Sequence, residues 1–511
     1  MLIETERKKL NLNKCFIRED ISDWVEQDII VPDNKPDAIK IINVTVNPYV
    51  SNYQLMDDKI KIEGKLNYYI IYKSNDTEMQ TRGLFTSFQY SQVLELKGAT
   101  KDMNASIKAY VRNVIYSLPN ERKIATKTEI IFRVRLDNNM PVSLISNFKD
   151  STDIECKTSV EKFNNIIATK KSIIASKEDI MLPRENEDFY EILKAVPVIS
   201  KTEYKESYNK IMVKGDIEIS MLYLTNNRNS PVKNVNLEVP FTGMIELDSM
   251  NDKSKYDISY SLQDFNINLN QEITTSRTFT VDYQVEANLT MYEPEDIEYI
   301  SDFYSQTRDL KYNINNIDIV KNMVNINKEI DLNETVSNVL NDDIILLSYG
   351  IDISNVLSRV VGNTVHIEGN AKLTLLLMNK KTDDVESKLV DMLVNEEYTI
   401  EDINQKSNVN VNIDLLSSNV SQSSNDVDVK IKLNAIIIVE DIYNINVIDN
   451  INDSNLNTND LDSMNIYIVK VNDTLWNIAK KYKTSVEKIV KINDIADIDN
   501  IAVGQKILII R

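Results

Sequence analysis

The chain has 511 residues and carries 78 acidic against 58 basic side chains, which gives a formal net charge of −20. This excess of negative charge argues against nucleic acid as a partner and against electrostatic docking onto an anionic membrane. A hydrophobic content of 42% argues against wholesale disorder, and the length predicts three or four domains.

The first residues, MLIETERKKLNLNKCF, lack the apolar segment of a secretory signal peptide. No apolar run in the sequence approaches the ~20 residues that a membrane-spanning helix needs. We therefore expect a protein without a membrane span, in the cytosol. The two cysteines, Cys15 and Cys156, fit a reducing compartment, because they form neither a disulfide framework nor a metal-binding spacing.

A recurring pattern begins with a polar, proline-containing stretch, VPDNKPDAIKII, and continues with an alternating stretch, KIKIEGKLNYYIIY (Lys59–Tyr72). Alternation of apolar and polar residues with a period of two predicts a half-buried strand. Gly64 falls on the apolar side of that strand, which indicates a bulge or the close approach of another backbone segment. Between the prolines and the strands we expect a short helical turn.

The alternating stretch returns twice, as KIMVKGDIEISMLY and as TVHIEGNAKLTLLL. The second copy also repeats the proline-containing stretch, as DIMLPRENEDFYEIL, whereas the third copy lacks it. The central glycines of the three stretches, Gly64, Gly215 and Gly369, lie about 150 residues apart. Repeats of this length are duplicated domains, because solenoid repeats are shorter, at roughly 20–50 residues. We expect a multidomain, mainly β (α+β) protein with three β-rich domains at 1–150, 151–305 and 306–450.

The VPDNKPDAIKII stretch followed by the Lys59–Tyr72 strand resembles the SPOCS domain, a module of spore coat-associated proteins in endospore-forming bacteria. The resemblance covers residues 16–138 and 178–292, and it extends more weakly over 328–445. It implies that the repeats belong to a protein of spore formation.

The stretch 451–464 is polar and rich in Asn and Asp, which is typical of a linker. Residues 465–511 follow it and predict a small separate domain with the order βααβ. An amphipathic spacing beginning at Leu475 predicts the first helix, with Asp473 as its N-cap. Thr484 and Glu487 predict a capping box for the second helix. The expected core consists of Tyr467, Leu475, Ile478, Ala479, Ile489 and Ile507.

This last segment closely resembles a LysM domain, with matches that include the Asp-Thr-Leu-Trp run at 473–476 and the Val-Gly-Gln run at 503–505. LysM domains usually bind N-acetylglucosamine-containing glycans between the loop before the first helix and the loop after the second. The resemblance implies that these two loops and the first helix supply the binding contacts, which here are Asn472, Asp473, Thr474, Leu475, Trp476, Asn493, Ile495, Ile498 and Val503.

Three of these loop residues depart from the usual LysM pattern. Asn472 replaces a glycine, and Ile498 and Val503 replace prolines. Asn accepts a positive φ better than most residues, so the first loop can keep its shape. The module is also basic, with seven Lys and one Arg against four Asp and one Glu in 465–511, on an acidic chain. These features favour a protein ligand over a glycan, although the lysines also fit a simple solvated helix face.

The sequence offers no catalytic constellation beyond chance pairs of carboxylates. Its single histidine, His366, cannot build a histidine-based zinc site, and it falls on the polar face of the third alternating stretch. No nucleotide-binding motif occurs. We therefore expect no enzyme activity, no catalytic residue, no metal site and no cofactor. A glycosidase needs only two carboxylates, so a wall hydrolase remains the rival interpretation.

The pairing of SPOCS-like repeats with one C-terminal LysM domain resembles the SipL family of clostridial endospore formers. The resemblance implies a non-enzymatic morphogenetic scaffold at the forespore surface, in the mother-cell cytoplasm and the basal layer of the spore coat. It also implies that the LysM domain binds SpoIVA, a coat ATPase, with other coat proteins as further candidate partners. The alternatives are a peptidoglycan-binding protein anchored by its LysM domain and a cell-wall hydrolase.

Overall fold

The computed structural model describes residues 3–76, 80–149, 152–227, 232–269, 277–382, 384–401, 403, 407–455, 464–498 and 500–510. Almost all of this is antiparallel β-structure, and the only helices in these ranges are α1 (Leu475–Tyr482) and α2 (Val486–Asn493). The expectation of a multidomain, mainly β protein is confirmed.

Each repeat folds into two three-stranded antiparallel sheets. In the first repeat, one sheet has the order β2-β3-β4 and the other has the order β1-β6-β5. Apolar side chains from both sheets fill the space between them, which makes the repeat a β-sandwich. The strands are β1 (Thr5–Ile30), β2 (Ala38–Met56), β3 (Lys59–Ser74), β4 (Thr81–Glu95), β5 (Asn104–Asn120) and β6 (Lys123–Phe148).

The second and third repeats have the same strand order as the first. The third repeat keeps this order although it lacks the proline-containing stretch. The second repeat consists of β7 (Ile154–Met181), β8 (Glu191–Ser207), β9 (Lys210–Leu224), β10 (Val232–Glu246), β11 (Lys255–Leu269) and β12 (Thr278–Ser305). The third consists of β13 (Arg308–Val336), β14 (Ile344–Val361), β15 (Thr364–Asn379), β16 (Val385–Thr399), β17 (Asn408–Ser423) and β18 (Asp426–Asn455).

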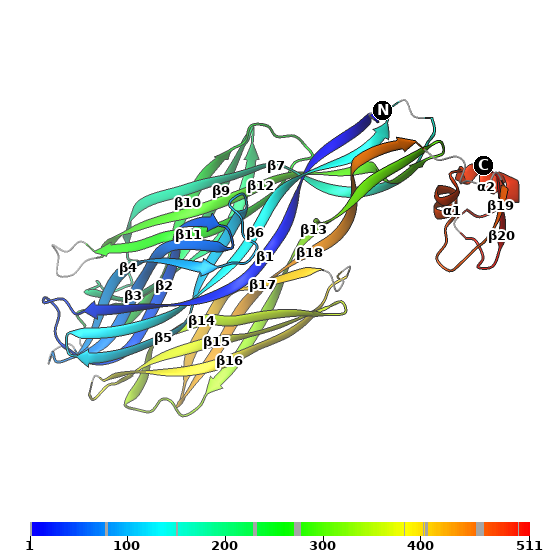
Figure 1. Ribbon diagram of the computed structural model, residues 1–511. Coiled ribbons are helices and arrows are strands. Elements are labelled where there is room, and N and C mark those ends of the chain that lie inside the picture. The colour runs from blue at the N-terminus through cyan, green and yellow to red at the C-terminus, as the bar shows by residue number, and fades with distance from the viewer. Residues whose placement is uncertain are drawn as a thin grey trace.

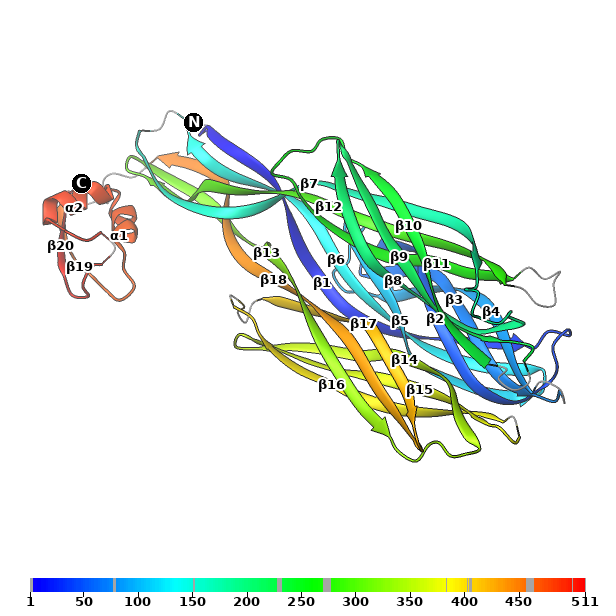
Figure 2. The same ribbon diagram turned by 180° about the vertical axis from the view of Figure 1, so that it is seen from behind.

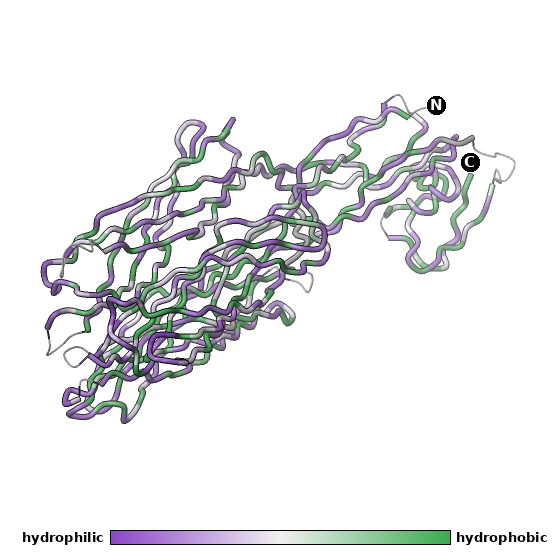
Figure 3. The backbone as a smooth tube through the Cα atoms, turned by 60° about the vertical axis from the view of Figure 1, so that its left-hand side comes forward, coloured by the Kyte–Doolittle hydropathy of each residue, from purple (hydrophilic) through white to green (hydrophobic). Residues whose placement is uncertain are grey.

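The three alternating stretches are the central strands β3, β9 and β15, as their period predicted. Figure 3 shows the resulting alternation of hydrophilic and hydrophobic residues along the strands. At Gly64, an added Cβ would overlap the carbonyl oxygen of Tyr49 on β2 and the ring of Tyr90 on β4. The predicted close backbone approach is therefore present, and it requires glycine.

The predicted helical turn after the prolines is wrong. Pro32 and Lys35 form a tight turn, with the Lys35 amide donating to the Pro32 carbonyl oxygen at 2.9 Å, and β2 starts directly at Ala38. Register shifts interrupt the pairing of β2 with β3 after Ala38 and after Ile41. Each extra residue at a bulge shifts the apolar positions out of a period of two, so that this strand has the spacing of a helix.

The two longest strands of each repeat extend beyond the sandwiches and converge into a stalk (Figures 1 and 2). The stalk is formed by the start of β1 with the end of β6, the start of β7 with the end of β12, and the start of β13 with the end of β18. Corresponding residues of the repeats pack together inside it. The buried set includes Val142, Leu144, Ile297, Tyr299, Ile445 and Val447.

A second shared core joins the sandwiches themselves, with Ile71, Leu222 and Leu376 holding corresponding positions in the three repeats. Lysines of the first repeat add ion pairs to the other two, namely Lys35–Glu191, Lys65–Asp264 and Lys73–Asp384. Shared apolar cores and ion pairs between repeats thus connect the three sandwiches into one body.

The C-terminal domain lies at the far end of the stalk (Figure 1). It consists of β19 (Met464–Ile468), α1, α2 and β20 (Lys506–Ile510), in the expected order βααβ. Strand β18 continues to Asn455, so the first five residues of the predicted linker 451–464 belong to a strand. The linker residues 456–463 lie outside the described ranges.

Candidate partner-binding site

Helix α1 begins one residue later than the sequence suggested. Its N-cap is Thr474, whose hydroxyl accepts from the Asn477 amide at 3.2 Å. The predicted cap, Asp473, accepts instead from the Tyr467 hydroxyl at 2.7 Å and from the Lys470 amide at 2.8 Å. Its carboxylate therefore closes the loop between β19 and α1 and cannot also cap the helix.

Helix α2 is likewise capped one residue later, by Ser485, whose hydroxyl accepts from the Lys488 amide at 3.2 Å. Thr484 does not form the predicted capping box, because its side chain is buried and donates to the Ile510 carbonyl oxygen at 3.2 Å. Because the Thr484 side chain is buried, the adjacent Ser485 caps the helix.

The small core largely follows the prediction. Five of the expected residues, Leu475, Ile478, Ala479, Ile489 and Ile507, are buried. The sixth, Tyr467, is only half-buried and packs edge-on against the ring of Tyr482.

Several predicted contact residues have structural roles in this domain. Leu475 is a core residue, and Ile495 packs half-buried against the same core. Asn493 donates to the carbonyl oxygens of Ile489 and Leu508 and accepts from the Leu508 amide, at 2.7–2.8 Å. Its amide thereby ties α2 to β20. With Asp473 and Thr474, five of the nine predicted contact residues therefore have structural roles within the domain.

Three predicted residues remain on the surface of the two loops. Asn472 has a φ of 67°, which is the left-handed conformation. Asn tolerates this conformation, so it can stand where the usual LysM pattern has glycine. Ile498 and Val503 are 54% and 64% exposed, and Val471, which the sequence reasoning missed, is 71% exposed. The Gly504 amide donates to the Val469 carbonyl oxygen at 2.8 Å, which holds the Val503 loop beside the start of the Val471 loop. We call Val471, Asn472, Ile498 and Val503 the loop patch.

The ninth predicted residue, Trp476, contacts the stalk and not a loop. Its indole N–H donates to Oδ2 of Asp302 on β12 at 2.7 Å, and its ring meets that of Tyr304 edge-on at 5.0 Å. Lys480, one turn further along α1, donates to Oδ1 of Asp302 at 2.5 Å and to the Tyr312 hydroxyl at 2.7 Å. We call Asp302, Tyr304 and Tyr312 the stalk joint.

The charge of Asp302 is stabilised by this contact. Burial alone would raise the pKa of this carboxyl group, but hydrogen bonds from Lys480, Tyr312 and Trp476 outweigh burial and hold the pKa below its ordinary value. The pKa of Lys480 is raised in turn, because its bonds to Asp302 and Tyr312 outweigh burial. Each partner thus favours the ionised form of the other.

Two other candidate residues, His366 and Cys156, lie in different repeats of the described structure. His366 lies on β15 of the third sandwich and not in the LysM domain or the stalk joint, and its Nδ1 is 2.9 Å from a carboxylate oxygen of Glu397. Cys156 is exposed and free, and the side chain of Cys15 lies outside the described residues. Within the described ranges, no group of three or more His, Cys, Asp or Glu residues could hold a metal ion. No helix in these ranges is long and apolar enough to cross a membrane.

Comparison with known families matches the two parts of the chain separately. A family profile described as "SipL, SPOCS domain" matches residues 37–118 and 188–270, which lie in the first and second sandwiches. A profile described as "LysM domain" matches residues 467–509. No curated protein and no solved structure matches the chain.

The fold and these matches define a class: a multidomain β protein whose matched domains are of non-catalytic binding families, with a C-terminal module of the peptidoglycan-binding type. More particularly, the chain carries SPOCS domains of the SipL type and is a sporulation-related protein, which confirms the resemblance to SipL. The third sandwich repeats the strand order of the two matched ones.

Proposed function

We propose that this protein is a non-enzymatic scaffold of spore coat assembly that binds a SpoIVA-like coat ATPase through its LysM domain. It acts in the mother-cell cytoplasm, at the forespore surface, and helps to localise the basal coat layer. The observation that carries the proposal is the combination, in one chain, of two SipL SPOCS matches with a C-terminal LysM match.

The surface of the LysM domain supports a protein partner. The loop patch presents Val471, Ile498 and Val503, each more than half exposed, where a glycan groove would need polar hydrogen-bonding groups. Exposed apolar side chains with a polar surround are typical of protein interfaces. The basic charge of residues 465–511 favours association with an acidic partner.

Capture of the SpoIVA-like ATPase by the full chain tests the proposal. Val503→Asp should abolish capture, because it places a charge in the apolar patch. Val361→Asp is the matched control, since Val361 is 58% exposed on β14 of the third sandwich. A tagged chain should also surround the forespore during sporulation. Capture that survives Val503→Asp, or a tagged chain spread evenly through the cell, would contradict the proposal.

A glycan ligand is the second candidate, because the LysM match itself favours it. Binding of the full chain to insoluble peptidoglycan, lost in Val503→Asp and kept in Val361→Asp, would support this candidate against the protein partner. A clearing zone in a peptidoglycan zymogram would go further and identify a wall hydrolase.

A further inference from the structure

The contact between α1 and the stalk joint is built from complementary groups on both sides. The LysM domain offers two donors, the Trp476 indole N–H and the Lys480 ammonium, and both are directed to the Asp302 carboxylate. The stalk joint offers the two rings that flank this carboxylate. Tyr304 meets the Trp476 ring, and Lys480 lies over the Tyr312 ring at 5.2 Å from its centroid.

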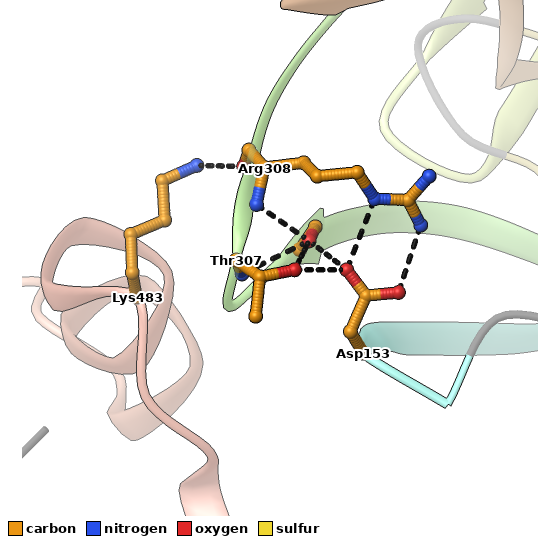
Figure 4. A network of polar contacts seen from close by, with 5 residues as sticks. Asp153, Thr307, Arg308 and Lys483 are labelled. Carbon is orange, nitrogen blue, oxygen red and sulfur yellow. Dashed lines mark hydrogen bonds and ion pairs between the residues drawn. The ribbon is translucent and has the colours of Figure 1, made fainter. Parts of the chain in front are cut away.

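Main-chain contacts fix the orientation of α1 on the stalk. The buried Tyr304 hydroxyl donates to the Thr484 carbonyl oxygen at 2.7 Å, between the two helices. Lys483, at the C-terminal end of α1, donates to the Arg308 carbonyl oxygen at 3.4 Å (Figure 4). Contacts along the whole length of α1 therefore hold it against the turn that joins β12 to β13.

This turn is itself held in place by Asp153, which precedes β7 in the second repeat. Its carboxylate accepts from Nε and Nη2 of Arg308 at 3.0 and 2.8 Å, and from the Thr307 hydroxyl at 2.6 Å (Figure 4). The hydrogen bonds from Arg308, Ser305 and Thr307 lower the pKa of Asp153 well below its ordinary value despite the opposing effect of burial. These bonds therefore fix the turn that lies between Tyr304 and Tyr312 of the stalk joint.

The other two repeats lack these groups at the corresponding places. Phe148, Phe303 and Ile451 pack at matching positions of the stalk, each three residues after an isoleucine. The residue before them is Asp302 in the second repeat, but an asparagine in the first and third, Asn147 and Asn450. An asparagine side chain is neutral and has one oxygen acceptor, so it cannot form the ion pair with Lys480 or accept the two donors through separate oxygens as Asp302 does. Among the three related positions, only Asp302 therefore carries the charge that matches α1.

We infer that the α1 face of the LysM domain is a recognition surface for a carboxylate set between aromatic rings, and that Asp302 of the stalk fills it in cis. The external ligand that fits this surface is an acidic protein segment with flanking aromatic side chains. Such a ligand has to displace Asp302, so the stalk joint acts as an internal competitor. This inference rests on the proposed function only in treating the LysM domain as a protein-binding module.

The cis contact can be followed with Trp476 as a probe. The chain has two tryptophans, and Trp24→Phe leaves Trp476 as the only tryptophan. In that background, Asp302→Asn should shift the Trp476 emission to longer wavelength and raise its quenching by acrylamide severalfold. Lys480→Met should do the same from the other side of the contact. Glu298→Gln, which neutralises an exposed carboxylate on the same strand β12, should leave both readings unchanged.

Ligand chemistry is tested with a synthetic peptide of residues 300–312, which contains Asp302, Tyr304 and Tyr312. The peptide should bind the Asp302→Asn chain severalfold more tightly than the parent, whose α1 face is filled, and should reverse the emission shift. A peptide with Asn in place of Asp302 should not bind. Unchanged Trp476 emission in both variants, or equal binding of the two peptides, would overturn the inference.

The outcome is separable from that of the proposed function. If the emission shift and the peptide response occur but the parent chain does not capture the SpoIVA-like ATPase, the recognition surface stands and the proposed function is wrong. If the parent chain captures the ATPase but neither Asp302→Asn nor Lys480→Met changes the Trp476 emission, the proposed function stands. The inference that Asp302 fills the α1 face in cis is then wrong.

Discussion

The Trp476 indole N–H donates to Oδ2 of Asp302 at 2.7 Å, although the two residues lie 174 positions apart in the chain. This bond places the LysM domain against the stalk and removes Trp476 from the loops where a glycan groove would be. It also divides the module into two surfaces, an α1 face held by the stalk joint and a loop patch that remains exposed.

Docking of the LysM domain should depend on pH through Asp302 and Lys480. Because hydrogen bonds outweigh burial and lower the pKa of Asp302 below its ordinary value of 3.8, its contribution is present above about pH 4. It is lost as the pH falls through the lowered pKa. The pKa of Lys480 is raised above 10.5, so its contribution is present below that pH and is lost as the pH rises through the raised pKa.

Fluorescence of Trp476 in the Trp24→Phe background should therefore show a docked plateau between about pH 4 and about pH 10. Acid should shift the emission to longer wavelength before the sandwiches unfold. The Asp302→Asn variant serves as the control, and its emission should lack the acid step. An acid step of equal size in that variant would mean that another group controls the release.

Leu475→Ala should unfold the LysM domain and leave the sandwiches folded. Leu475 is 1% exposed, and truncation of a buried leucine costs about 2–5 kcal/mol, which is comparable to the whole stability of so small a domain. Within the described ranges the helices lie only in this domain, so the helical part of the far-UV circular dichroism should disappear. Leu357→Ala, at a 64% exposed site on β14, should leave the spectrum unchanged. A helical signal that persists in Leu475→Ala would refute this assignment of the core.

Asn493→Ala should weaken partner capture only by destabilising the domain. Loss of its three hydrogen bonds leaves groups of Leu508 and Ile489 without that partner, at a cost of about 2–3 kcal/mol. Asn477→Ala, at an exposed position of α1, should stay within about 0.5 kcal/mol of the parent. Thermal unfolding of the LysM domain measures both. Normal stability combined with lost capture would restore Asn493 as a contact residue.

Local patterns in the sequence predicted the elements whose period is undisturbed. The strands β3, β9 and β15 and the two LysM helices follow directly from apolar spacing, which is a property of neighbouring residues. The start of strand β2 was predicted wrongly as a helical turn, because its bulges shift that spacing. The stalk joint could not be predicted, since nothing near Asp302 or Trp476 in the chain indicates that they meet. Of the loop patch, the sequence predicted Asn472, Ile498 and Val503 but missed Val471. It also could not separate these exposed residues from the predicted contacts that have structural roles inside the domain.

Gly64→Ala tests the close approach that the sequence did predict. A Cβ at this position would overlap the backbone of Tyr49, which cannot move without breaking the pairing of β2 with β3. We expect a loss of about 3 kcal/mol or more, measured as a lower urea midpoint. Gly350→Ala on β14 is the control, because its Cβ would meet only the flexible end of Lys194. Equal midpoints for the two variants would contradict the proposed clash.

The last prediction concerns the charges buried between repeats. Arg135 on β6 contacts the fully buried Glu440 of β18 at 2.8 Å and Asp137 at 2.7 Å. Asp257 of the second repeat lies near this group. Its pKa is raised, because burial and the charges of Asp137 and Glu440 outweigh Arg135. The arginine is thus the positive charge that offsets carboxylates of all three repeats.

Arg135→Met should therefore destabilise the body by about 3–5 kcal/mol, because it removes the cation that pairs with a buried carboxylate. Arg133→Met is the matched control on the same strand. Arg133 forms a two-bond pair with Asp20, which is 40% exposed, so its loss should cost about 1 kcal/mol or less. Adding Glu440→Gln to Arg135→Met should recover part of the loss, because it removes the buried charge itself. Urea unfolding of the four chains measures these differences. If the two arginine variants lose equal stability, or if Glu440→Gln worsens Arg135→Met, then the charges at this junction do not connect the repeats as the geometry implies.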